Sequence, residues 1–175
     1  SRRKSMQNLE IERKYLIVLP DEEFLKSREG CVVKHITQTY LLRHENDVER
    51  RIRKIEDGKN TIYVYTEKRP KSSTTRLEDE RDITENEYNE LMKERFSYLT
   101  KTRYAFPYSA HTVEIDVYPY EIGGDALVGR AVMEVELKDE NEMIDFPSGI
   151  TVIRELTGTR EFSNKTLAKR VRQSD

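Results

Sequence analysis

Acidic and basic side chains recur at every second position along most of the β-like segments of this chain. Residues two apart in a β-strand point to the same face, so each run would form a charged stripe. The first stripe combines Glu10, Glu12 and Lys14. The others are Glu49, Arg51 and Arg53; Thr66 and Lys68; Arg76, Glu78 and Glu80; Lys101 and Arg103; Thr112, Glu114, Asp116 and Tyr118; and Glu134, Glu136 and Lys138. Their repetition indicates one extended charged surface.

The residue types in these stripes suit metal and phosphate chemistry. Carboxylate oxygens are the ligands that Mg²⁺ and Mn²⁺ prefer, and the absence of a His/Cys cluster disfavours a dedicated zinc site. Arg and Lys donate hydrogen bonds to phosphate oxygens. A bound metal would polarise a terminal phosphoryl group and lower the pKa of a water. The stripes therefore predict a surface that could act on a linear polyphosphate.

The elements that must position these stripes are mainly strands. Period-two runs bounded by turn residues predict eight strands, and the short connections between most of them favour antiparallel neighbours. The predicted strands are 9–18, 33–43, 47–56, 60–69, 75–83, 99–107, 110–119 and 130–138. Helices are expected at 21–27, at 84–97, where Thr84 and Glu87 form a capping box, and at 163–172. The expected fold class is all-β dominated (α+β): an eight-stranded antiparallel β-barrel with a few covering helices.

The direction of the charges leaves two alternatives. A conventional small barrel points apolar residues inward and charges outward. Against this, acidic and basic residues cluster at i, i+2 spacing with few Ser, Thr or Asn between them, and amphipathic helices are available to cover an apolar outer face. We therefore favour a barrel with a charged lumen.

Amino-acid composition excludes several classes of protein. Charged residues make up 37% of the 175 residues, yet the net charge is only −2, which disfavours a simple nucleic-acid binder. Cys31 is the only cysteine, so an intrachain disulfide is excluded. No apolar run is long enough for a membrane helix, and we expect a cytoplasmic protein. Residues 1–8 are expected to be an extension or expression remnant, and 9–172 one domain.

The ordered motifs resemble those of the CYTH superfamily, the triphosphate tunnel metalloenzymes, and in particular its short bacterial members. The segment Glu10-Ile11-Glu12-Arg13-Lys14 matches the ExExK signature of that family. The later motifs, in family order, are Arg51-Ile52-Arg53, Thr66-Glu67-Lys68, Glu78-Asp79-Glu80-Arg81, Lys101-Thr102-Arg103, Glu114-Ile115-Asp116-Val117-Tyr118, Glu134-Val135-Glu136 and a tail containing Thr159-Arg160 and Ser163-Asn164. One ExE motif is weak evidence, but seven in order are specific.

The resemblance implies an eight-stranded tunnel with inward charges and an activity that depends on Mg²⁺ or Mn²⁺. It places the metal on Glu10, Glu12, Asp116, Glu134 and Glu136. It implies phosphate binding by Lys14, Arg51, Arg53, Lys68, Lys101, Arg103 and Arg160. The implied catalytic set is Lys14, Arg51, Arg53, Lys68, Glu78, Glu80 and Glu114, and the C-terminal helix would cap one mouth of the tunnel.

The expected function is a metal-dependent triphosphatase, a phosphoric anhydride hydrolase that releases the terminal phosphate, with inorganic tripolyphosphate as first substrate. Three alternatives stay open: a class IV-type adenylate cyclase, a thiamine triphosphatase, and a module that binds polyphosphate or nucleotide without turnover. The expected partner is a small-molecule triphosphate, with no membrane or nucleic acid, and a homodimer is an open alternative. The scattered His35, His44 and His111 are not expected to bind metal.

Overall fold

A single antiparallel sheet of ten strands dominates the computed structural model, which describes residues 6–71 and 76–174, without the side chains of residues 6–10 and 172–174. The strands are β1 (Met6–Glu10), β2 (Glu12–Val18), β3 (Val32–Leu41), β4 (Glu49–Asp57), β5 (Asn60–Pro70), β6 (Arg76–Ile83), β7 (Arg95–Tyr108), β8 (His111–Val117), β9 (Arg130–Glu136) and β10 (Val152–Glu155). Their order across the sheet is β1-β6-β5-β4-β3-β7-β8-β9-β2-β10. The prediction of a mainly antiparallel β fold is confirmed.

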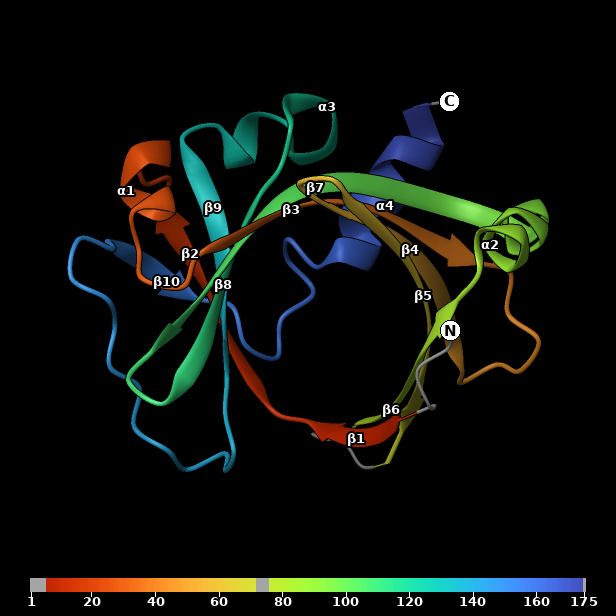
Figure 1. Ribbon diagram of the computed structural model, residues 1–175, viewed down its shortest axis with the longest axis horizontal. Helices are drawn as coiled ribbons and strands as arrows, with labels where there is room; N and C mark the ends of the chain where they lie inside the picture. The colour runs from red at the N-terminus through yellow and green to blue at the C-terminus, as the bar shows by residue number, and fades with distance from the viewer. Residues whose placement is uncertain (1–5, 72–75, 175) are drawn as a thin grey trace.

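The sheet curls around a central opening but does not close through hydrogen bonds between strands (Figure 1). The strand predicted over 9–18 is interrupted at Ile11, so that β1 pairs with β6 on one side while β2 pairs with β9 on the other. The backbone at Ile11 thus connects the two sides of the curve, and its carbonyl accepts a hydrogen bond from the Leu137 amide at 2.9 Å. A closed eight-stranded barrel is therefore not what the structure shows. Residues 6–8, expected to precede the domain, lie in β1.

Four α-helices accompany the sheet: α1 (Glu22–Lys26), α2 (Glu85–Leu91), α3 (Tyr120–Gly123) and α4 (Asn164–Ser174). The helix predicted over 84–97 is shorter, because a 3₁₀ turn (Met92–Glu94) follows α2 and β7 begins at Arg95. Neither α3 nor β10 is predicted from the sequence, because each has only four residues, too few for a clear periodic pattern. In the described part of the chain, no helix combines the length and the apolarity needed to cross a membrane.

Helices and a loop cover parts of the outer, convex face of the sheet (Figure 1), and apolar side chains of the strands pack beneath them. Leu25 of α1 packs with Ile17, Phe106 and Ile115, and Ile144 of the segment that follows β9 contacts the same cluster. A second cluster, formed by Leu41, Ile52, Tyr65, Ile83 and Tyr88, lies beneath α2. Because side chains alternate along a strand, the charged stripes must then point to the inner, concave face.

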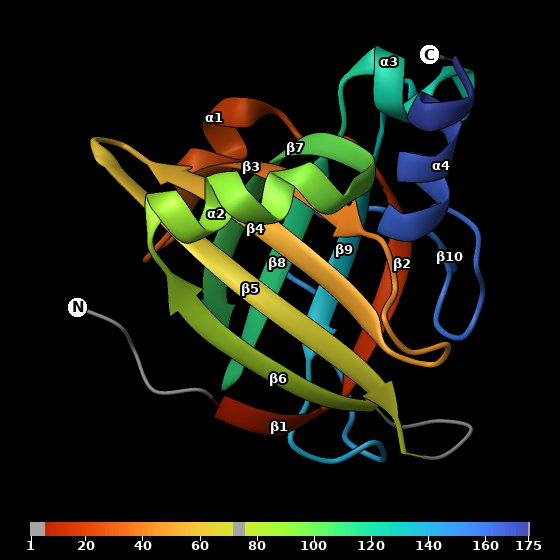
Figure 2. The same cartoon turned by 90° about the vertical axis from the view of Figure 1, so that its right-hand side faces the viewer.

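Helix α4 lies at one end of the curved sheet (Figure 2). Leu167 and Ala168 of this helix are 1% and 0% exposed, and they pack against Leu16, Leu99 and Val132. These three partners share the inner face with the charged stripes, as the strand registers show. The apolar face of α4 therefore fills one end of the inner face, which agrees with the expectation that the C-terminal helix caps it.

The capping box at the start of α2 is present as predicted. The Thr84 hydroxyl accepts a hydrogen bond from the Glu87 amide at 3.1 Å, and the Glu87 carboxylate accepts one from the Thr84 amide at 3.3 Å. We expect Thr84→Ala to lower the free energy of unfolding by about 1 kcal/mol, because an orphan amide at the helix start loses its acceptor. Urea denaturation would measure the loss. Thr84→Ser, which keeps the hydroxyl, should retain most of the stability, and equal losses in both variants would contradict the capping role.

Candidate functional site

One wall of the inner face, formed by β8, β9 and β2, is rich in carboxylates. Strand register places Glu12 directly opposite Glu136, and Glu114 directly opposite Glu134. Glu134 also faces Lys14 across the β2–β9 pair, with 3.5 Å between the ammonium nitrogen and a carboxylate oxygen. Three neighbouring strands therefore bring together the predicted acidic residues Glu12, Glu114, Glu134 and Glu136. The first and the last of them are more than 120 residues apart in the sequence.

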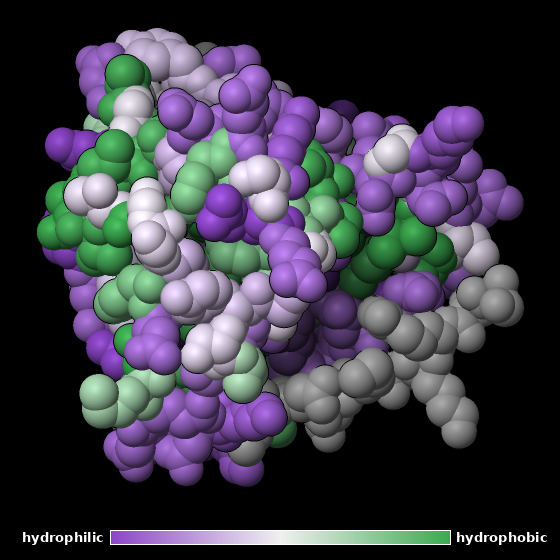
Figure 3. Space-filling view, turned by 60° about the vertical axis from the view of Figure 1, so that its left-hand side comes forward, coloured by the Kyte–Doolittle hydropathy of each residue, from purple (hydrophilic) through white to green (hydrophobic). Residues whose placement is uncertain are grey.

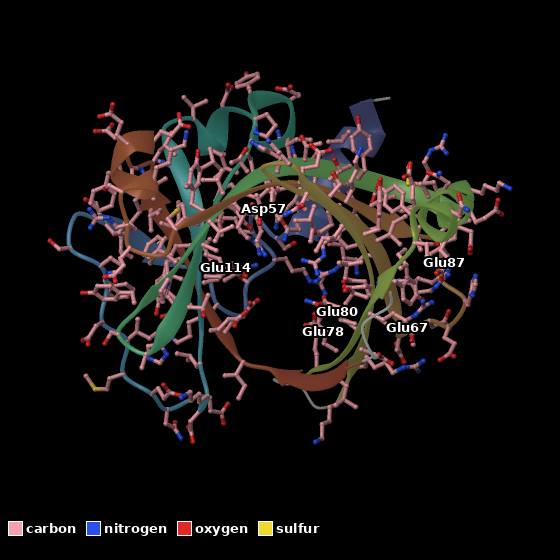
Figure 4. All side chains as sticks on the ribbon, viewed as in Figure 1. Asp57, Glu67, Glu78, Glu80, Glu87 and Glu114 are labelled. Carbon is pink, nitrogen blue, oxygen red and sulfur yellow. The ribbon has the colours of Figure 1, made fainter. Side chains whose placement is uncertain are left out.

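The facing wall, formed by β4, β5 and β6, supplies three of the seven predicted phosphate-binding cations, Arg51, Arg53 and Lys68. Arg53 forms an ion pair with Glu80 at 2.6 Å, and the Thr66 hydroxyl donates a hydrogen bond to the same carboxylate oxygen at 3.1 Å. Lys68 lies directly opposite Glu78 in the β5–β6 register. Figure 4 shows Glu78 and Glu80 on the inner side of this wall and Glu114 on the inner side of the other, whereas Glu67 and Glu87 lie outside. In the space-filling view, hydrophilic side chains lie at the bottom of a hollow (Figure 3).

Asp116 holds the two predicted phosphate-binding cations of β7, Lys101 and Arg103, in place. Its carboxylate accepts hydrogen bonds from Arg103 Nε at 2.8 Å, Arg103 Nη2 at 2.9 Å and Lys101 Nζ at 2.8 Å. The side chains of Asp116 and Lys101 are 2% and 1% exposed, so these bonds are shielded from water. Glu114 accepts a further bond from Arg103 Nη1 at 3.1 Å. Asp116 therefore fixes the direction of both cationic groups.

Asp116→Ala should destabilise the fold strongly. Removing one partner from a buried ion pair typically costs about 3–5 kcal/mol, because the remaining charges lose their compensation. Burial alone would raise the pKa of Asp116, but Arg103 and Lys101 overcome it and lower that pKa. A carboxyl whose pKa is lower in the folded state stabilises the protein above its unfolded pKa of about 3.9, and this stabilisation is lost as the pH falls toward the folded pKa.

Urea denaturation at neutral pH and at about pH 3 would test this prediction. The wild-type chain should lose stability between the two pH values, and the loss should be smaller in Asp116→Ala. The exposed pair of Arg13 and Glu155, at 2.9 Å on the outer face, gives a control in Glu155→Ala, which should cost at most about 1 kcal/mol. Equal effects of the two substitutions would contradict the anchoring role of Asp116.

The guanidinium group of Arg53 on β4 is crowded by the like charges of Arg51 on the same strand and of Arg103 on β7. Burial, followed by the neighbouring Arg51 and Arg103, lowers the pKa of Arg53 to about 10 against the opposing effect of Glu80. The Nε atom of Arg53 is buried, and it has no hydrogen-bond partner among the residues that the structure describes. Such crowding of like charges costs free energy that a bound anion would offset. The arrangement is therefore suited to a phosphate group that accepts hydrogen bonds from several guanidinium donors.

The other inner charges respond to burial according to their neighbours. Burial lowers the pKa of Lys101 to about 8, with a further contribution from Arg103, although Asp116 acts in the opposite direction. Burial raises the pKa of Glu114, which Arg103 only partly offsets. Burial would also raise the pKa of Glu134, but Lys14 and Arg103 overcome it, so that this pKa is lowered. Glu134 is thus held ionised, as a metal ligand must be.

The carboxylates of Glu12, Glu134 and Glu136 have the donor chemistry that Mg²⁺ and Mn²⁺ require. Within the described residues, however, no group of three or more His, Cys, Asp or Glu side chains is arranged to hold an ion. The backbone of Glu10 lies in β1, and its side chain is outside the description. Asp116 already accepts hydrogen bonds from two cations on both of its oxygens, so a metal there would have to displace one of them. The metal set stays a prediction.

One predicted site residue, Arg160, and two residues that were not predicted, Gln38 and Tyr40, remain to be placed. Arg160 is exposed in the turn before α4, where its carbonyl accepts a hydrogen bond from the Ser163 amide at 3.2 Å. Gln38 and Tyr40 of β3 lie on the inner face opposite Arg53 and Arg51, and the Gln38 amide donates a hydrogen bond to the Tyr40 hydroxyl at 2.8 Å. Sequence reasoning missed them because the β3 stripe is neutral at these positions. The inward alternation of that strand was the available signal.

Two cavities adjoin the sheet outside the two walls. One of about 250 Å³ lies beside α2, where Arg50 and Arg81 flank the Tyr65 ring at 5.9 and 5.1 Å and pair with Glu94 and Glu87. The other, of about 410 Å³, lies where β8 leaves β7. It is lined by His35, Ile36, Thr37, Glu56, Thr100, Lys101, Thr102, Val117, Tyr118 and Pro119. The charges beside α2 hold local structure, so the inner face remains the candidate site.

Of three comparisons with known proteins, only the comparison with solved structures finds similar proteins. No protein-family model matches the chain. No curated protein matches it either. Among solved structures, the inorganic triphosphatase NE1496 aligns at 24% identity over 91% of this chain and 97% of that chain, with a TM-score of 0.56. A second structure of NE1496, described as a hypothetical protein, aligns at 26% identity over the same shares with a TM-score of 0.55.

Two further structures share the fold. PH1819 from Pyrococcus horikoshii OT3 aligns at 25% identity over 75% of this chain and 80% of that chain, with a TM-score of 0.51. A Bacillus halodurans protein described as a candidate adenylate cyclase aligns at 18% identity over 77% and 83%, with a TM-score of 0.53. With its ordered motifs and its charged inner face, the chain thus shares the fold of the CYTH-type triphosphate tunnel proteins.

Proposed function

We propose that this protein is a triphosphatase that depends on Mg²⁺ or Mn²⁺ and releases the terminal phosphate of inorganic tripolyphosphate. The observation that carries the proposal is the crowding of like charges around Arg53, from Arg51 and Arg103, on a face whose other wall is carboxylate-rich. A linear triphosphate bears negative charge along its whole length, and it would neutralise the guanidinium groups. A metal ion would neutralise the opposing carboxylates.

The chain's own residues would divide the work between positioning and charge stabilisation. Arg51, Arg53 and Arg103 would bind phosphate oxygens, with Lys14, Lys68 and Lys101 as further donors. Glu80 would orient Arg53, to which it is bonded at 2.6 Å, and Asp116 would orient Arg103. Glu12, Glu134 and Glu136, with Glu10, would hold the metal, which would supply Lewis-acid polarisation of the phosphoryl group. Phosphoryl transfer depends mainly on such positioning and electrostatics.

The likeness to NE1496, named an inorganic triphosphatase, supports hydrolysis as the reaction class. The Bacillus halodurans protein keeps the cyclase alternative open, since its fold is shared. The two reactions differ in whether water or a ribose 3′-hydroxyl is aligned on phosphorus. A cytoplasmic location and a homodimer stay predictions.

A substrate panel tests the proposal directly. Release of inorganic phosphate would be measured with tripolyphosphate, thiamine triphosphate and nucleoside triphosphates, each with Mg²⁺, with Mn²⁺ and with EDTA. We expect release from tripolyphosphate that either metal supports and EDTA abolishes. Cyclic AMP formed from ATP would instead establish the cyclase. Metal-dependent binding of tripolyphosphate without any product would establish a binding module, and the proposed activity would then be rejected.

A further inference from the structure

Helix α4 contributes one polar group to the charged inner face, the side-chain amide of Asn164. Its Oδ1 accepts a hydrogen bond from the Lys101 ammonium at 3.4 Å and a second one from the Tyr118 hydroxyl. Lys101 lies 63 residues and Tyr118 lies 46 residues from Asn164 in the sequence. The three residues come from β7, from the position directly after β8 and from α4, so the contact exists only in the folded chain.

The orientation of the Asn164 amide is fixed by its partners. A lysine ammonium carries only donors, so the atom facing it must be the amide oxygen and not the nitrogen. A tyrosine hydroxyl carries its proton at neutral pH, so the Tyr118 hydroxyl can donate to the same oxygen. An amide oxygen can accept two hydrogen bonds. Both are used here.

Asn164 also determines where the Lys101 ammonium points. A lysine side chain has four rotatable bonds, and holding it in one conformation costs entropy. Asp116 accepts one of its three N–H groups at 2.8 Å, and Asn164 lies at 3.4 Å from the same nitrogen. Two acceptors on different elements restrict the rotation of the ammonium far more than one acceptor does. The third N–H group of Lys101 then stays available for another acceptor.

We propose that Asn164 is a positioning residue that aims Lys101 at the substrate phosphate, so that docking of α4 completes the site. The proposal rests on the triphosphate-binding function of the inner face. Helix α4 is held by groups other than Asn164: Leu167 and Ala168 are buried, and Arg170 donates a hydrogen bond to the Gly123 carbonyl at 3.1 Å. Loss of the Asn164 amide should therefore leave the helix docked and disturb only Lys101 and Tyr118.

A matched control lies one residue earlier. The Ser163 hydroxyl accepts a hydrogen bond from the Thr166 amide at 3.2 Å and caps the start of α4, and among the described residues its side-chain hydrogen bonds are to Thr166 and not to Lys101. Ser163→Ala weakens the same helix end while keeping the Asn164 amide. Asn164→Ala removes the acceptor of Lys101 while keeping the cap. A purely structural role of the helix end predicts equal effects of the two changes.

Calorimetric titration with tripolyphosphate in EDTA, together with kcat and KM for phosphate release, tests the proposal. We expect Asn164→Ala to weaken binding and to lower kcat/KM, each by about 10-fold or more, because small misplacement of a reacting group has large effects. Ser163→Ala should change both by less than about 2-fold and lower mainly the melting temperature. In a Lys101→Met background, Asn164→Ala should weaken binding by less than about 2-fold, since coupled sites are not additive.

Three results would overturn the inference: equal losses from Ser163→Ala and Asn164→Ala, a full loss from Asn164→Ala in the Lys101→Met background, or no loss at all. If the wild-type chain binds tripolyphosphate but releases no phosphate, the proposed hydrolase fails while the binding data still decide the role of Asn164. If it neither binds nor cleaves tripolyphosphate, both proposals fail.

Discussion

Arg53→Met is expected to lower kcat/KM for tripolyphosphate by about 10²- to 10³-fold, the range seen when one preorganised charge-stabilising donor is removed. Arg53 is 12% exposed and lies among Arg51, Arg103 and Glu80. Its lowered pKa, about 10, shows that this position disfavours the guanidinium charge when no anion is bound. The melting temperature should therefore stay unchanged or rise while activity falls. Phosphate release and thermal unfolding would be measured on the same preparations.

Arg81→Met is the matched control for this prediction. Arg81 follows Glu80 on β6, but it points to the outer face, where it pairs with Glu87 at 3.3 Å. The substitution removes the same functional group two strands away from Arg53, with β5 between them, and on the opposite side of the sheet. It should leave kcat/KM within about 2-fold of the wild-type value. Similar losses from both variants, or wild-type activity in Arg53→Met, would show that the inner guanidinium does not bind substrate.

Glu136→Ala is expected to abolish metal-supported activity while the fold is kept. Glu136 lies directly opposite Glu12 and two residues from Glu134 on the same strand, so its removal relieves repulsion between carboxylates as well as removing a proposed ligand. A metal that binds only the folded state raises stability according to its affinity. The wild-type melting temperature should thus rise with Mn²⁺ in a concentration-dependent way. The rise should be lost in Glu136→Ala and, in the wild type, after addition of EDTA.

Glu155→Ala gives the control for the metal prediction, because Glu155 is an acid of the neighbouring edge strand β10 that pairs with Arg13 on the outer face. This variant should keep both the Mn²⁺-induced shift and the activity. An unchanged shift in Glu136→Ala would place the metal elsewhere. Unfolding of Glu136→Ala without metal would instead assign the residue a structural role.

The sequence determined the strand faces and the types of charge on them. A period of two assigns Lys101 and Arg103, or Glu134 and Glu136, to one face wherever the strand lies in the sheet. Two predicted stripe residues, Tyr118 and Lys138, lie beyond the ends of β8 and β9. The capping box at Thr84 was equally predictable, because all of its atoms lie within one helical turn. Local rules were sufficient for these features.

Only the tertiary structure decided which charges meet and how the sheet ends. The interruption at Ile11, which leaves the sheet open, follows from β1 and β2 pairing with different strands, and alternation within one segment cannot reveal that. Asp116 turned out to hold Lys101 and Arg103, because cross-strand register places their side chains together. Asn164 reaches Lys101 only because α4 packs onto the end of the inner face. Such contacts depend on packing between distant segments, and no local pattern encodes them.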